Sequence, residues 1–327
     1  MNRREFIALA GGAAVVWPLP VRAQQSGMPV IGFLSAASAA ATPQNAAALR
    51  EGLADAGFVE GKNIAIEFRF ADQHLERLPR LAIDLVRRQV AVIVTGGGDV
   101  PAMIAKGATS TVPIVFVTGF DPVKSGLVNS LNRPGGNVTG ATVIASQLSE
   151  KRLELLRDLM PSVRHIAVLI NQDNPNAETD APDLEAAART LGIQIEFLKA
   201  SDEREVDSAF VSLAQLKADA LLLDPDPLFT TLRQKIVALA EHQSVPAVYY
   251  SRDYTDVGGL ISYGASFEGA YRQAGTYAGR IIKGEKPADL PVVQPAKFEL
   301  VINLKSAKTL GLTIPGAVLA RADRVIE

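Results

Sequence analysis

Polar side chains and glycines follow the short apolar runs of this 327-residue chain. In the first half of the chain these positions are Ser35, Thr95, Gly96, Gly97 and Asp121, and in the second half they are Asn171, Asn174, Asp224 and Tyr250. Carboxylates and amides can pair with an ammonium group, and glycine N–H groups at the start of a helix can hold a carboxylate. The pattern predicts a site for a small polar molecule, and capping of the following helices is the alternative.

Two of these segments carry the clearest chemistry. Gly96-Gly97-Gly98 has neither the spacing of a phosphate-binding loop nor that of a dinucleotide-binding turn, so a carboxylate site or a plain tight turn remains. Asp224 and Asp226 in Leu-Asp-Pro-Asp-Pro could pair with an ammonium group, but they have no partner at a catalytic spacing. Both segments favour binding over catalysis.

The residue inventory excludes much catalytic chemistry. The chain has no cysteine, and its three histidines are not at metal-ligand spacing. Gly264-Ala-Ser-Phe-Glu268 has glutamate where the nucleophile elbow of a serine hydrolase needs glycine. We therefore expect no enzyme, no cofactor and no metal.

Charge and aromatic residues narrow the class of ligand. Lys plus Arg (33) nearly balances Asp plus Glu (35), so we expect no nucleic-acid partner. Aromatic residues lie beside the polar positions, namely Phe120, Phe229, Tyr249, Tyr250 and Tyr254. They could enclose an apolar or aromatic ligand body, or they could be ordinary core residues.

Apolar runs rich in Val, Ile and Leu alternate with amphipathic stretches after residue 28. This rhythm predicts an α/β fold of two doubly wound parallel-sheet lobes, in which ligands bind at the carboxyl ends of the strands. We expect an N-terminal lobe over residues 28–145 with part of 255–295, and a C-terminal lobe over 146–254. The closing segment, 296–327, is not assigned to a lobe.

Residues 1–23 have the pattern of an export signal peptide. Arg3 and Arg4 precede the apolar run Ile7–Trp17, and Ala23 offers a cleavage site. The arginine pair favours the twin-arginine route, with a general secretory signal as the alternative. The run is shorter than the ~20 residues that span a bilayer, so we expect a mature chain in the periplasm without membrane insertion.

Several longer motifs make the chain recognisable. They are Gly57-Phe-Val-Glu-Gly-Lys-Asn-Ile64, Asp121-Pro-Val-Lys-Ser-Gly-Leu-Val128, Arg133-Pro-Gly-Gly-Asn-Val-Thr-Gly140, Asn174-Pro-Asn-Ala177, Gly258-Gly-Leu-Ile-Ser-Tyr-Gly264 and Phe298-Glu-Leu-Val-Ile-Asn-Leu304, together with Arg3-Arg-Glu-Phe-Ile and Arg22-Ala-Gln-Gln25. Over nearly its whole length the chain resembles the substrate-binding proteins of ABC transporters. It is most similar to the group with a type-I periplasmic-binding fold that has tryptophan-binding members.

This resemblance implies two lobes joined by several crossing strands, with a ligand held between them by hinge closure. It transfers a binding role to Ser35, Thr95, Gly96, Asp121, Asn171, Asn174, Asp224 and Tyr250. The chain departs from the family pattern at Gly98-Asp99, where a threonine or serine is expected, and at Tyr249–Tyr254, where many relatives have an acidic residue or a larger aromatic cluster.

We therefore expect a monomeric solute-binding component of an ABC importer that captures a small zwitterion or carboxylate, such as an amino acid or aromatic acid. Its partners would be that small-molecule ligand and a membrane permease. Two alternatives are an exported enzyme acting on a small polar substrate and a soluble sensory ligand-binding protein.

Overall fold

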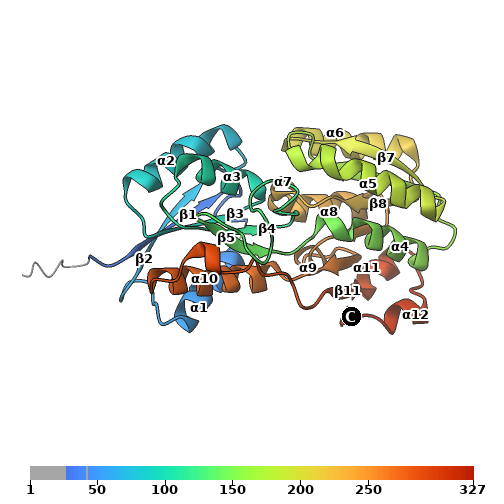
Figure 1. The fold of residues 1–327 in the computed structure, drawn as a ribbon. Helices are drawn as coiled ribbons and strands as arrows, with labels where there is room; N and C mark the ends of the chain where they lie inside the picture. Colours follow the sequence, from blue (N-terminus) through green and yellow to red (C-terminus); the bar gives the residue numbers. More distant parts are fainter. Residues whose placement is uncertain (1–26, 42) are drawn as a thin grey trace, which may run out of the picture.

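The computed structural model describes residues 27–41 and 43–327, so the expected export segment lies outside the described residues. Two lobes lie side by side, each built on one β-sheet with helices on both faces (Figure 1). The fold is therefore α/β with two sheets, as the alternation of apolar runs predicts. No helix among the described residues is long and apolar enough to cross a membrane.

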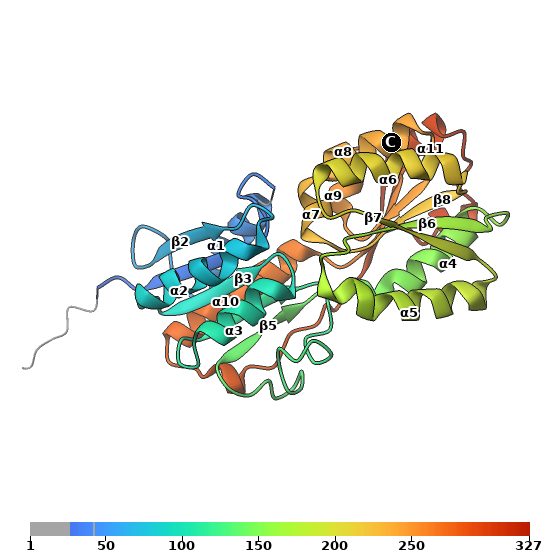
Figure 2. The same ribbon diagram turned by 90° about the horizontal axis from the view of Figure 1, so that it is seen from above.

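The first lobe contains a fully parallel sheet in the order β2-β1-β3-β4-β5. Its strands are β1 (Val30–Ser35), β2 (Ala65–Phe70), β3 (Val92–Gly96), β4 (Ile114–Thr118) and β5 (Val138–Thr142). Its helices are α1 (Pro43–Asp55), η1 (Leu75–Arg77), α2 (Leu78–Arg87), α3 (Asp99–Ala108), α10 (Phe267–Ile282) and η3 (Pro287–Asp289). Helix α10 comes late in the chain yet packs beside α1 (Figure 2).

The second lobe contains a seven-stranded sheet in the order β12-β11-β10-β9-β8-β6-β7. Its strands are β6 (His165–Ile170), β7 (Gln194–Lys199), β8 (Ala220–Leu223), β9 (Ala247–Tyr249), β10 (Ile261–Gly264), β11 (Glu299–Asn303) and β12 (Arg324–Ile326). Its helices are η2 (Ser146–Leu148), α4 (Ser149–Leu159), α5 (Pro175–Leu191), α6 (Glu203–Leu216), α7 (Pro227–Thr231), α8 (Arg233–His242), α9 (Arg252–Thr255), α11 (Leu304–Thr309) and α12 (Gly316–Leu319).

The closing segment, which the sequence did not assign to a lobe, lies in the second lobe. Strand β11 pairs antiparallel with β10, so this sheet is mixed rather than purely parallel. The chain returns from the first lobe after η3 and enters the sheet from the opposite end, which reverses the direction of β11. Strand β12 then pairs parallel with β11 at the sheet edge.

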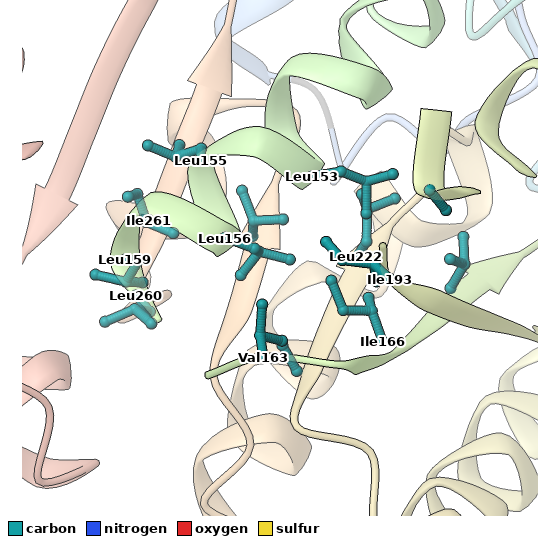
Figure 3. Close-up of a cluster of buried hydrophobic side chains, with 14 of the residues drawn as sticks. Leu153, Leu155, Leu156, Leu159, Val163, Ile166, Ile193, Leu222, Leu260 and Ile261 are labelled. Carbon is teal, nitrogen blue, oxygen red and sulfur yellow. The ribbon is translucent and has the colours of Figure 1, made fainter. Parts of the chain in front are cut away.

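Alternate side chains of the central strands pack on opposite faces of each sheet. In β8, Ala220 and Leu222 join the core beneath α4 and α5, whereas Leu221 and Leu223 join the core beneath α6 and α8. Figure 3 shows the first of these cores, where leucines of α4 meet Leu222 and Ile166 of the sheet. Burial on both faces explains why these strands are continuously apolar rather than alternating.

Three segments connect the lobes: residues 143–145, 265–266 and 290–298. The fully buried Arg152 of α4 joins the first of these connections to strand β10, which leads into the second connection. Its guanidinium donates to the carbonyl of Ala145 at 2.8 Å and to that of Tyr263 at 2.9 Å. Burial lowers the pKa of Arg152 to about 10, which leaves it charged at neutral pH. The arginine thereby fixes the geometry of the hinge.

The close contact of α1 and α10 makes a first prediction. A Cβ on Gly275 would lie 2.2 Å from the Leu49 carbonyl oxygen, so Gly275→Ala must push the two helices apart. We expect its free energy of unfolding to fall by about 1–3 kcal/mol. The control Gly107→Ala, in open space on α3, should leave stability unchanged or raise it by up to ~1 kcal/mol. Urea denaturation followed by circular dichroism measures both, and equal effects would contradict this packing.

Candidate ligand-binding site

The carboxyl ends of the central strands of both sheets meet between the lobes. The lobes approach closely here, because a Cβ on Gly98 would lie only 3.6 Å from the Pro227 ring. Two small cavities, of about 50 and 140 Å³, share the lining residues Gly97, Gly98, Phe120, Asp226 and Pro227. These cavities form the interlobe cleft, and helix α7 of the second lobe faces the first lobe across it (Figure 2).

The first lobe supplies a glycine wall to the interlobe cleft. Gly97 and Gly98 have φ values of 76° and 88°, a left-handed backbone that favours glycine, and Gly98 is the N-cap of α3. A Cβ on Gly97 would lie 3.1 Å from the Ala36 nitrogen, and one on Gly96 would lie 2.1 Å from the Tyr271 hydroxyl. Gly98 therefore brings backbone N–H groups and the N-terminus of α3 to the interlobe cleft.

Two tyrosine rings form part of the opposite wall, in the second lobe. Tyr250 contacts Tyr254 edge-on with ring centroids 5.2 Å apart, and it contacts Phe267 of α10 at 6.4 Å. The Tyr254 hydroxyl donates to that of Tyr250 at 2.9 Å, and Tyr250 donates to the Asp226 carbonyl at 3.0 Å. These hydrogen bonds fix the ring orientations, so the wall is rigid and suits a flat apolar ligand body.

Asp226 is the polar centre of the second-lobe wall. Its carboxylate accepts from the side-chain amides of Asn171 (3.1 Å) and Asn174 (2.7 Å) and from the Leu228 N–H (2.8 Å). Burial raises the pKa of Asp226, and these three donors oppose that rise. The two asparagines thus hold Asp226 in place. Asn174 also caps α5 by accepting from the Asn176 N–H, so this cleft residue is a helix cap as well.

Asp253 and Asn45 bring further polar groups to the interlobe cleft from opposite lobes. Burial raises the pKa of the Asp253 carboxyl, while the Ser251 hydroxyl and the charge of Arg233 oppose the rise. Asn45 lies in the first turn of α1 and hydrogen-bonds the Tyr271 hydroxyl. A carboxyl group and an amide therefore line the same cavity from opposite lobes.

The nine residues that the sequence predicts as ligand-binding lie in three different places in the structure. Gly97, Asn171, Asn174 and Tyr250 line the interlobe cleft. Behind them lie three buried residues of the first lobe, Ser35, Thr95 and Gly96. The Ser35 hydroxyl accepts from the Ala37 N–H at 3.2 Å, so it shapes the loop next to Gly97.

Asp121 and Asp224 lie elsewhere, at a separate cavity that shares no lining residue with the interlobe cleft. Asp121 caps a turn by accepting from the Val123 N–H at 2.8 Å. Asp224 ends beneath α5, whereas Asp226, only two residues later, faces the cleft. The sequence could not separate them, because both follow the same strand.

Several cleft residues were not among the nine. The sequence suggests that Asp226 could pair with an ammonium group and that Phe120 and Tyr254 could enclose a ligand, and all three line the interlobe cleft. Tyr249 and Phe229, which the sequence places with these aromatic residues, are buried in the second-lobe core. Phe267 and Tyr271 carry no local signal, because α10 belongs to the first lobe although it follows the second-lobe strands. Ser266, the N-cap of α10, indicates where this helix begins, but it does not indicate the lobe to which the helix belongs.

Contacts across the interlobe cleft hold the lobes together. The Gln73 amide of the first lobe donates to the Thr231 hydroxyl at 2.8 Å and to the Pro227 carbonyl at 3.2 Å. Arg233 donates back to the Ala41 carbonyl at 2.9 Å. The lobes are therefore in a closed arrangement.

Two lobes closed over a cleft, each with strand ends facing it, define a ligand-binding protein of the type-I periplasmic-binding fold. The family model described as ABC transporter substrate binding protein matches residues 30–326. The chain belongs to that family, in agreement with the resemblance of its motifs.

Two of the similar proteins have a ligand in their names. The chain is 28% identical over 260 residues to a tyrosine-binding protein of Clostridioides difficile, which covers 80% of this chain and 74% of the relative. A Streptococcus pneumoniae ABC domain in complex with L-Trp is 26% identical with a TM-score of 0.83, over 92% of this chain and 100% of that one. A conserved domain protein of Vibrio cholerae is 28% identical with a TM-score of 0.85, over 91% and 100% of the two chains.

A third solved structure, the ligand-free, open form of a Clostridium difficile substrate-binding protein, has a TM-score of 0.65 at 25% identity over 91% of this chain and 99% of that one. The L-Trp complex reaches 0.83 at nearly the same identity. The whole-chain likeness is therefore greater to the ligand-bound relative than to the open one, which agrees with the contacts across the interlobe cleft.

Burial of Asp224 predicts a pH effect on stability. Burial, with repulsion from Asp180, raises the pKa of Asp224 to about 8, although Arg152 opposes the rise. The folded state then holds a proton that the unfolded state releases, so the contribution of Asp224 to stability is present below about pH 4 and is lost as pH rises towards 8. Asp224→Asn should remove a decline of up to ~1.4 kcal/mol per pH unit over that range.

Urea denaturation of the wild type and of Asp224→Asn at several pH values measures this difference. Other titrating groups are common to both proteins and cancel in the comparison. Parallel pH profiles for the two proteins would show that Asp224 is ionised in the fold throughout.

Proposed function

We propose that this chain is the solute-binding component of an ABC importer and that it binds an aromatic amino acid in the interlobe cleft. The ligand carboxylate is placed at the N–H groups around Gly97 and Gly98, and its ammonium group at Asp253. Its ring lies against Tyr250 and Phe120. The proposal assigns no reaction to the chain.

The observation that carries this proposal is the joint presence of aromatic rings, a carboxylate and a glycine-rich helix N-terminus around one cleft. A zwitterion needs an acceptor and a donor set, and a ring needs flat apolar partners. The ligands named for the relatives, tyrosine and L-Trp, support the same class of molecule.

Ligand binding would be coupled to closure of the two lobes. Only the closed arrangement contacts a ligand from both lobes, so the ligand shifts the hinge equilibrium towards it. The export signal expected at residues 1–23 supports a periplasmic location for the mature chain, where a membrane permease would receive the ligand from a monomeric closed form.

Calorimetric titration of the mature chain with L-tryptophan, L-tyrosine, L-leucine and indole-3-acetate tests the ligand class. We expect the two aromatic amino acids to bind more tightly than leucine, which lacks a ring, and than indole-3-acetate, which lacks an ammonium group. Absence of heat with both aromatic amino acids would reject the proposal.

Asp253→Asn tests the ammonium contact. A hydrogen bond to a charged group contributes about 1.5–3 kcal/mol, so L-tryptophan affinity should fall by about 10- to 150-fold. The control Asp256→Asn removes a nearby carboxylate that pairs with Arg324 outside the cleft, and it should change affinity less than twofold. Equal affinities of the Asp253 variant and the wild type would remove Asp253 from the ligand contacts.

Gln73→Ala tests the role of closure. The substitution removes two hydrogen bonds made across the cleft, each with a net value of about 1 kcal/mol, so ligand affinity should fall by about 5- to 30-fold. Gln215→Ala, at an exposed position of α6, is the matched control. An unaltered affinity for Gln73→Ala would mean that these bonds do not favour the ligand-bound state.

A further inference from the structure

A second cavity, of about 550 Å³, lies beneath α5 and is larger than the interlobe cleft. It is bounded by α4, α5 and the carboxyl ends of β6 and β8, with the turn at Asp121–Lys124 of the first lobe at its edge. None of its lining residues belongs to the interlobe cleft, so the proposed amino-acid site does not account for it.

The lining of this second cavity is strongly acidic. Its carboxylates come from both lobes and are Asp121, Glu150, Asp180, Asp183 and Asp224. Lys124 is the one basic residue in this lining, and its ammonium group lies 3.4 Å from Asp180 and 3.3 Å from Asp183. The remaining charge is negative, which favours a cationic occupant.

Asp224 is the innermost of these carboxylates. It is 7% exposed, and no side-chain hydrogen bond or ion pair joins it to any residue in the described part of the chain. The nearby Arg152 does not neutralise it by contact, because that guanidinium donates to Ala145, Tyr263 and Ser149 instead. A buried carboxylate without a partner, facing a cavity, is costly unless it is neutralised by a proton or a cation.

The character of the walls selects the kind of cation. The cavity is also lined by the apolar residues Ile170, Leu184, Ala187 and Phe197, two of which share helix α5 with Asp180 and Asp183. In the described ranges, no three carboxylate or imidazole groups are arranged to hold a metal ion. An apolar side next to a carboxylate suits an ammonium group attached to a hydrocarbon chain.

We propose that the second cavity binds a small aliphatic amine, with the ammonium group paired to Asp224 and the hydrocarbon chain against Leu184 and Ala187. This site is distinct from the interlobe cleft, so the chain would take two ligands of different charge. Asp180 lies close enough to Asp224 to act on it electrostatically, and it adds a second carboxylate beside the ammonium group.

Calorimetric titration of the mature chain with n-pentylamine tests this site directly, with n-pentanol as the neutral analogue of equal length. At about pH 8.5 the amine is charged and the carboxyl groups are largely ionised. We expect pentylamine to bind at least tenfold more tightly than pentanol. Equal binding of both, or no binding of pentylamine, would overturn the proposal.

Asp224→Asn keeps the side-chain shape and removes the charge, and it should weaken pentylamine binding at least tenfold. Asp158→Asn removes a carboxylate that pairs with Arg321 at the far end of α4, and it should leave binding within twofold. Unchanged binding by Asp224→Asn would overturn the assignment. Circular dichroism confirms that each variant is folded, and L-tryptophan titration reports the interlobe cleft independently, so failure at one site is distinguishable from failure at the other.

Discussion

The structure depends on one geometric constraint: the carboxyl ends of two separate sheets must face each other across a hinge. Each lobe alone supplies only part of the residues that line the interlobe cleft. Three connecting segments join the lobes, and Arg152 binds the carbonyl groups of Ala145 in the first of them and of Tyr263 in strand β10. The three hydrogen bonds that this buried guanidinium donates offset part of the cost of its desolvation.

The first lobe also depends on a close approach between segments distant in the chain. Gly52 and Gly275 allow α1 and α10 to touch through their backbones. That contact brings Phe267 and Tyr271 to the interlobe cleft, so packing far from the cleft places two of its aromatic residues. The fold and the cleft are therefore not separable, because the helix that completes the first-lobe core also completes the wall of the cleft.

Much of the fold follows from the sequence, because buried parallel strands such as Val92–Gly96 and Ala220–Leu223 are apolar on both faces and helices separate them. The antiparallel β11 was not foreseen, since strand direction depends on which lobe the chain returns from. At the site, strand ends identified Gly97, Asn171, Asn174 and Tyr250. The local sequence does not predict that Asp224 lines the cavity beneath α5 while Asp226 lines the interlobe cleft. The direction of a side chain after the end of a strand is set by tertiary contacts.

Small-angle X-ray scattering of the mature chain, with and without saturating L-tryptophan, tests most directly whether a ligand is held between closing lobes. The account predicts that the radius of gyration falls when the amino acid binds and that the bound profile matches the closed arrangement described above. Binding of L-tryptophan with no change in the scattering profile would contradict it.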